Sequence, residues 1–182
     1  MIRIIQVAVI ILIVICTAFS IPQATPLPEK LEWKTHFLGA PDNHSPYYAQ
    51  TATRWHYRYK AKISGNDLYL DFNFSAAVDP NESWVKLDRL HSAEAKRKLL
   101  KHEQGHADIN FLLLKDGEQK IRYQAYTLKN YKRGIAENAE KISRYYSDMQ
   151  ARYDAETQHG ALEEAQKRWD KQIALELKRF IR

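Results

Sequence analysis

The sequence predicts an α+β protein in which an N-terminal antiparallel β-sheet packs against three C-terminal helices. Two patterns support this fold class. Residues 53–75 alternate between apolar and polar side chains, with the period of two expected for half-buried strands. From residue 92 onward, apolar residues recur three and four positions apart, which is the period of an amphipathic helix. Because the pattern changes once, we expect residues 31–182 to form a single domain with a strand half and a helix half.

The N-terminus has the features of a secretory signal peptide. A short basic start precedes an apolar run from Ile4 to Ile15, and small residues of a signal-peptidase site follow it. We therefore expect residues 1–20 to be a signal peptide, residues 21–30 a linker, and the protein to be secreted or periplasmic. Two alternatives stay open, namely a membrane anchor formed by the uncleaved segment and a lipid attached to Cys16.

Composition and charge exclude several classes of protein. The 182 residues are 45% hydrophobic and 27% charged, which is typical of a globular chain and not of a disordered one. A single cysteine allows neither an intramolecular disulfide nor a cysteine-based zinc finger. The formal net charge is +6, and loss of Arg3 with the signal peptide would leave +5. For an exported protein this charge favours an anionic envelope surface over nucleic acid as a partner, and the alternative is a basic surface that binds no partner. The sequence predicts no particular oligomeric state.

The N-terminal half is expected to supply the strands. Residues 31–38 are predicted to form the first one. Residues 53–63 place aromatic and aliphatic side chains on one face and basic side chains on the other. A turn at residues 64–66 and renewed alternation through residue 75 complete an antiparallel hairpin with one buried and one exposed face. A short last strand is expected within residues 83–87.

The C-terminal half is expected to contain three helices. The first begins after Ser92, a residue suited to the N-cap, and is expected to end at Gly117. A second, long helix is predicted over residues 121–149 and a third over residues 162–180. Residues 153–160, between these two helices, are predicted to form a turn-like joint.

A metal-binding pattern lies within the first predicted helix. His102 and His106 belong to an H-E-x-x-H sequence, and residues four apart on a helix lie about 5–6 Å apart at their Cβ atoms. Two imidazoles in this arrangement can bind one Zn²⁺, while Glu103 lies beside the metal, where it can accept a proton from water. Gly105 costs about 1 kcal/mol relative to alanine inside a helix, which indicates a close neighbour. The alternative is a pair of core histidines hydrogen-bonded to their surroundings.

A catalytic zinc usually takes three protein ligands, so a further ligand is expected from outside this helix. Leu112 stands where a metzincin has its third histidine, which excludes that class. His159, in the predicted joint, is the only histidine that follows the motif, and we expect its ring to point at the other two. Carboxylates compete with it for the role of third ligand, namely those of Glu137, Glu140, Asp154 and Glu156.

These residues resemble those of DUF922, a bacterial family of predicted secreted zinc-dependent proteases. The resemblance is carried by the blocks Leu100–Ile109 and Tyr153–Gly160, together with Gln166 and Trp169. It implies export and a zincin-like active helix. It also implies that His159 is the downstream histidine that belongs with the motif.

The function that the sequence predicts is that of an exported zinc metallopeptidase acting on a peptide or protein substrate. Glu103 is expected to be the general base, with His102, His106 and His159 as zinc ligands. One alternative is a non-catalytic envelope-binding or scaffold protein in which the histidines are structural. Another is a zinc amidase acting on cell-wall peptides, which would use the same residues. Metal stoichiometry and turnover distinguish the enzyme from the scaffold.

Overall fold

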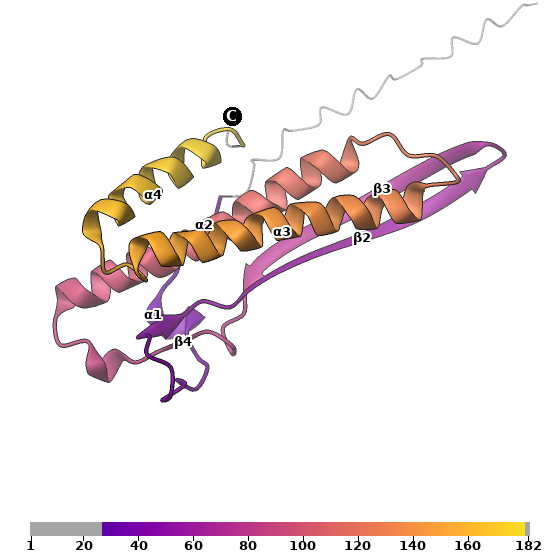
Figure 1. The fold of residues 1–182 in the computed structure, drawn as a ribbon. Helices are drawn as coiled ribbons and strands as arrows, with labels where there is room; N and C mark the ends of the chain where they lie inside the picture. Colours follow the sequence, from indigo (N-terminus) through magenta and orange to yellow (C-terminus); the bar gives the residue numbers. More distant parts are fainter. Residues whose placement is uncertain (1–26, 181–182) are drawn as a thin grey trace, which may run out of the picture.

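The computed structural model describes residues 27–180, and these form the predicted α+β fold (Figure 1). The strands make two separate antiparallel sheets, each of two strands. A long hairpin consists of β2 (Thr53–Ser64) and β3 (Asp67–Val78). A small sheet consists of β1 (Ala49–Gln50) and β4 (Trp84–Val85). The predicted signal peptide, Cys16 and most of the predicted linker lie outside the described residues.

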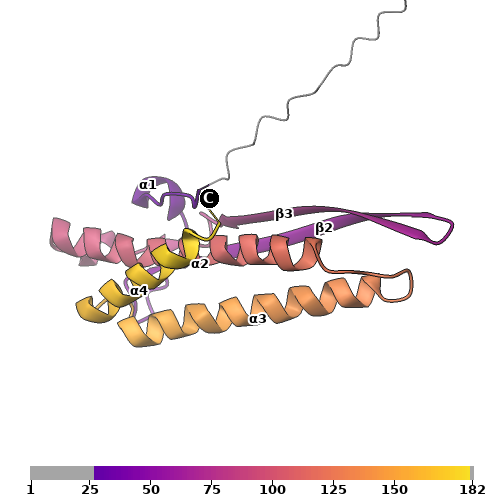
Figure 2. The ribbon, with the colours of Figure 1, turned by 90° about the horizontal axis from the view of Figure 1, so that it is seen from above.

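The long hairpin has the two faces that its alternation predicts. Its register runs from the pair Thr53–Val78 to the pair Ser64–Asp67 next to the turn. The aromatic face lies against the helices, and Phe72 is part of the main core. On the opposite face Lys60 lies across from Asp71, so that the acidic residue offsets part of the basic stripe. The tip of the hairpin projects past the ends of the helices (Figure 2).

The helical half consists of α2 (Ala93–Arg122), α3 (Tyr131–Thr157) and α4 (Glu163–Leu177). The Ser92 hydroxyl accepts a hydrogen bond from the Ala95 N–H, which confirms the predicted N-cap. α2 lies between the hairpin and α3, and α3 runs antiparallel to it (Figures 1 and 2). Side chains from β3 and all three helices share one apolar core. No helix among the described residues is long and apolar enough to cross a membrane.

Three predicted helix boundaries are wrong. α2 does not end at Gly117 but continues to Arg122. The glycine serves packing there, since a Cβ atom would lie 2.9 Å from the indole of Trp55. The second helix begins at Tyr131, because residues 123–130 form the connection between α2 and α3. It also continues through most of the predicted joint and ends at Thr157.

The predicted first strand over residues 31–38 is also wrong, because the segment forms one helical turn, α1 (Trp33–His36). The rings of Trp33 and Phe37, one turn apart, contact each other at a tilt, with centroids 4.6 Å apart. Leu31 and Phe37 are buried against other apolar side chains, so tertiary packing decides the conformation. The predicted last strand is present as β4 within residues 83–87, and a short 3₁₀ helix, η1 (Leu87–Arg89), follows it.

Candidate metal centre

The two histidines of the motif lie on the side of α2 that faces α3. His102 is 1% exposed and the side chain of His106 is 13% exposed. Their rings meet edge to face with centroids 5.0 Å apart. The helical spacing therefore brings the two imidazoles together as the sequence predicts.

Hydrogen bonds fix which nitrogen of His102 carries the proton. The amide nitrogen of Gln166 donates to the Tyr153 hydroxyl and to Asp170, in both cases at 2.7 Å. The amide oxygen of Gln166 therefore faces His102 Nδ1, at 3.1 Å. Since an amide oxygen can only accept, Nδ1 is the protonated nitrogen and Nε2 of the neutral ring keeps its lone pair. Metal-binding histidines are oriented in this way.

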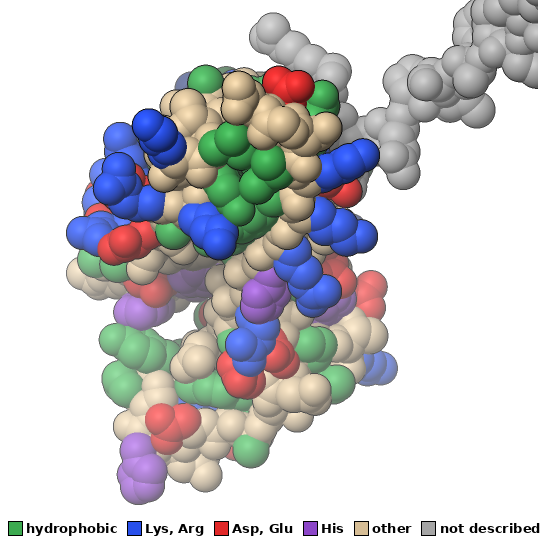
Figure 3. All heavy atoms as spheres, turned by 90° about the vertical axis from the view of Figure 1, so that its right-hand side faces the viewer, with side chains coloured by type: hydrophobic (Ala, Val, Ile, Leu, Met, Phe, Trp, Pro, Cys, Tyr) green, Lys and Arg blue, Asp and Glu red, His purple; other side chains and the backbone are tan. Residues whose placement is uncertain are grey.

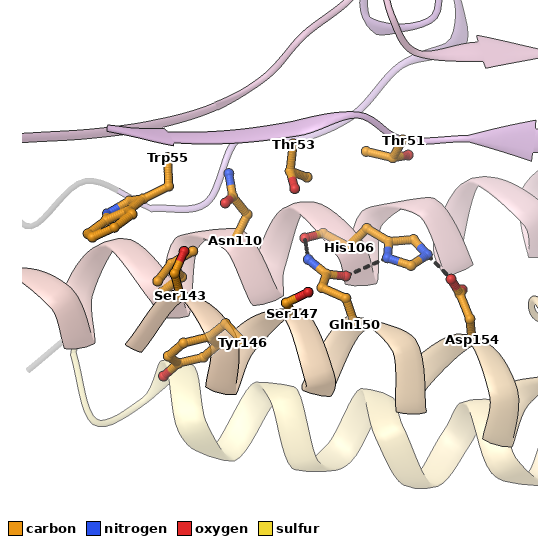
Figure 4. Close-up of a pocket in the computed structure, with 11 residues that line it drawn as sticks. Thr51, Thr53, Trp55, His106, Asn110, Ser143, Tyr146, Ser147, Gln150 and Asp154 are labelled. Atoms are coloured by element: carbon orange, nitrogen blue, oxygen red, sulfur yellow. Dashed lines mark hydrogen bonds and ion pairs between the residues drawn. The ribbon is translucent and has the colours of Figure 1, made fainter. Parts of the chain in front are cut away.

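Gln150 of α3 orients His106 in the same way. Its amide nitrogen donates to the His106 carbonyl oxygen at 3.0 Å, and its amide oxygen accepts from His106 Nδ1 at 2.5 Å (Figure 4). Nε2 of His106 therefore also keeps its lone pair when the ring is neutral. Both histidines thus present the nitrogen that a metal ion would bind.

Asp154 lies at the point on which the histidine rings converge. Its Oδ1 atom is 3.1 Å from His102 Nε2, 2.9 Å from His106 Nε2 and 3.5 Å from His159 Nδ1. Burial raises the pKa of Asp154. His102 and His106 donate hydrogen bonds to Asp154 when their Nε2 atoms are protonated, and these bonds outweigh burial and hold this pKa well below its usual range. A carboxylate surrounded by ring nitrogens requires positive charge between them, supplied either by protons or by a cation.

The other three carboxylates that were candidates for the third ligand lie away from the histidines. Glu156 accepts a hydrogen bond from the indole of Trp169 at 2.8 Å. Glu137 and Glu140 are exposed on α3 and form ion pairs with arginines one turn away. Asp154 is therefore the competing carboxylate that the structure places at the histidines.

His159 reaches the centre through a left-handed turn after α3. Gln158, His159 and Gly160 all have positive φ, at 48°, 53° and 81°. A Cβ atom on Gly160 would lie 2.9 Å from the Cβ atom of His102, so only glycine permits both this conformation and this close approach. The ring of His159, 37% exposed, packs at a tilt against Tyr47 with centroids 3.8 Å apart. Partial burial lowers the pKa of His159, which favours the neutral form that binds metal.

A metal ion could therefore be held by several groups at this point. One ligand atom from each of His102, Asp154 and His159 lies within 4.8 Å of the other two. His106 contacts the same oxygen of Asp154 from α2. Two of the three predicted histidines, His102 and His159, thus form one possible metal-binding group with Asp154, and His106 adjoins this group through the shared oxygen of Asp154.

Glu103 lies beside this centre, where the motif predicts the general base. It is 3% exposed, and its Oε2 atom accepts a hydrogen bond from the Thr51 hydroxyl at 2.6 Å. Glu103 and the metal-centre residues line a cavity of about 170 Å³ whose opposite wall includes Tyr47 and β1. Figure 3 shows a gap between the helical body and the smaller lobe below it, with histidine side chains at its rim. Glu103 therefore borders a cavity next to the two histidines of the motif.

The predicted close neighbour of Gly105 is Tyr153. A Cβ atom at position 105 would lie 2.2 Å from the Tyr153 hydroxyl oxygen, which explains why glycine stands in the middle of the helix. The Tyr153 hydroxyl donates to the His102 carbonyl oxygen at 2.9 Å, and the tyrosine ring stacks on the His102 ring. Burial raises the pKa of Tyr153, so the hydroxyl stays protonated. Tyr153 therefore holds His102 in place and is not itself a candidate metal ligand.

A family model described as "Bacterial protein of unknown function (DUF922)" matches residues 29–160. The chain belongs to the DUF922 family. The matched region of this DUF922 protein contains the H-E-x-x-H motif, Asp154 and His159, whereas Gln166 lies beyond it. No curated protein matches the chain, and no solved structure does.

Three residues of the centre were not predicted from the sequence, namely Tyr47, Thr51 and Gln150. A sequence pattern could have identified Gln150. Gln150 and Asp154 are four residues apart on α3, as His102 and His106 are on α2, so that two antiparallel helices present matching pairs. Tyr47 precedes β1 and Thr51 follows it, and in these irregular segments no periodicity indicates a contact with α2.

Proposed function

We propose that this DUF922 protein is an exported zinc-dependent metallopeptidase. The observation that carries the proposal is the orientation of His102 and His106. Amide oxygens hold both Nδ1 protons, and both Nε2 atoms face one oxygen of Asp154. When both rings are neutral, each Nε2 lone pair faces a carboxylate oxygen, so two hydrogen-bond acceptors repel each other. A cation bound between the Nε2 atoms and Asp154 would make both contacts favourable.

The groups present fit a zinc ion in both donor type and charge. Imidazole nitrogen and carboxylate oxygen are the ligands of catalytic zinc sites. His102, His106 and His159 would supply nitrogen, and Asp154 is the adjoining carboxylate. The half-buried carboxylate of Asp154 would offset part of the positive charge of the ion. When bound, zinc would supply a Lewis acid that polarises a peptide carbonyl and activates water.

Glu103 would move the proton in this reaction. The Thr51 hydroxyl occupies one acceptor position of Oε2 and fixes the orientation of the carboxylate. The remaining lone pairs of Glu103 can accept a proton from the attacking water and then pass it to the leaving amine. The cavity that adjoins Glu103 gives a substrate carbonyl access to the same place.

Metal content and turnover test this proposal together. We expect the purified protein to hold about one zinc per chain and to cleave an unstructured protein such as casein. A chelator should remove both properties, and added Zn²⁺ should restore both. A zinc-loaded protein that cleaves neither proteins nor peptides would support the envelope-binding or scaffold alternative. Cleavage of cell-wall peptides alone would support the amidase alternative.

Export is part of the proposal, because the first twenty residues have signal-peptide features. We expect protein isolated from the producing cell to begin near Ile21, as read by N-terminal sequencing. A chain that begins at Met1 in the membrane fraction would instead indicate an anchor. A lipid found on Cys16 would contradict both.

A further inference from the structure

A second cavity, of about 430 Å³, adjoins the candidate metal centre, and we call it the polar groove. It shares Thr51, His106 and Asp154 with the cavity at Glu103, so the two are adjacent. β2 and α3 form its two sides, with α2 between them, and Trp55 lies at the end away from Asp154 (Figure 4). Ser143 and Asp154 are eleven residues apart on α3, which corresponds to about 16 Å. About five residues of extended polypeptide have this length.

The sides of the polar groove are neutral beyond the metal centre. Apart from His106 and Asp154, the described side chains that line it carry no charge, namely those of Thr51, Thr53, Trp55, Asn110, Leu113, Ser143, Tyr146, Ser147 and Gln150. A charged side chain of a ligand would lose hydration in the groove without gaining a counter-ion. The groove therefore favours an uncharged ligand.

The polar groups of the groove suit a polypeptide main chain. The amide nitrogen of Asn110 donates to the carbonyl oxygens of Arg54 and Ala77, at 3.0 and 3.3 Å, which leaves the amide oxygen as an acceptor. Ser143 and Ser147 lie one turn apart on the same side of α3, and neither hydroxyl has a side-chain partner among the described residues. A serine hydroxyl both donates and accepts, so it can pair with either group of a peptide unit.

We propose that the polar groove binds about five residues of an extended polypeptide without charged side chains, on one side of the bond to be cleaved. An apolar side chain of this segment packs against Trp55, Leu113 and Tyr146 at the far end. The position of the cleaved bond rests on the proposed function. The binding of the segment does not, because the neutral walls recognise it whether or not hydrolysis follows.

Peptide binding to the Glu103→Gln protein tests the groove without cleavage. The probe is a fluorescent peptide of Ala, Ser and Asn with a terminal Phe, and binding is measured by fluorescence anisotropy. We expect an Asp at the middle position of the peptide to weaken binding at least about 10-fold. Ser147→Lys should weaken binding of the neutral peptide and strengthen binding of the Asp peptide. Ser75→Lys, the same change on the exposed face of β3, should alter neither affinity.

The outcomes separate this inference from the proposed function. Equal binding of neutral and charged peptides, no binding of either, or an unchanged preference in Ser147→Lys would each overturn the inference. Circular dichroism shows whether each variant is folded. If the neutral peptide binds selectively while the zinc-loaded wild type hydrolyses nothing, the proposed function fails and the polar groove stands as a peptide-binding site.

Discussion

Replacing Glu103 with glutamine is expected to lower kcat by about 10²–10⁴-fold while leaving about one zinc per chain. Glutamine keeps the size of the side chain and can still accept a hydrogen bond from the Thr51 hydroxyl, which lies 2.6 Å from Oε2 in the wild type. It cannot take a proton from water at neutral pH, so the loss should appear in kcat. Hydrolysis of casein and elemental analysis of the same preparation measure the two properties.

A matched variant on the same helix is the control for Glu103→Gln. Glu118→Gln makes the same chemical change in α2, at a residue whose ion pairs are with Lys115 and Arg122. We expect it to keep the wild-type kcat and zinc content. Full activity in Glu103→Gln would show that the proposed mechanism is wrong. Loss of zinc in that variant would show instead that Glu103 takes part in holding the metal.

Local periodicity was sufficient to predict most of the fold. The alternation along β2 and β3 and the spacing of apolar residues in α2 and α3 reflect which side chains meet the core, so these elements could be predicted. The single turn of α1 could not, because its conformation depends on the burial of Leu31 and Phe37 against Val78 and Ala107. Two-residue strands such as β1 are too short to carry a period.

Part of the candidate site could be predicted because the H-E-x-x-H spacing lies within one helix. The approach of His159 depends on the antiparallel pairing of α2 with α3 and on the left-handed turn at residues 158–160. From the sequence, Asp154 was only one of four carboxylates that could be the third zinc ligand. Its selection follows from the register of the two helices, in which Gln150 meets His106 and Asp154 meets both histidines.

Removing an imidazole of the motif is expected to weaken zinc binding at least about 100-fold and to abolish hydrolysis with it. His106→Ala deletes a nitrogen that lies 2.9 Å from the shared oxygen of Asp154. His102→Ala should act in the same way, whereas His56→Ala, at an exposed histidine on β2, should bind zinc like the wild type. Titration against a chelator of known zinc affinity measures the effect. If both His102→Ala and His106→Ala bind zinc with wild-type affinity, the two histidines have only a structural role.

The same titration identifies the groups that complete the zinc site. We expect His159→Asn and Asp154→Asn each to weaken binding by about 10-fold or more, because one loses a nitrogen ligand and the other loses a charge that balances the ion. If Asp154→Asn binds zinc like the wild type and His159→Asn does not, the three histidines hold the ion alone. The reverse result would make Asp154 the third ligand. His159, which packs against Tyr47 in the wall of the cavity, would then be free to contact substrate.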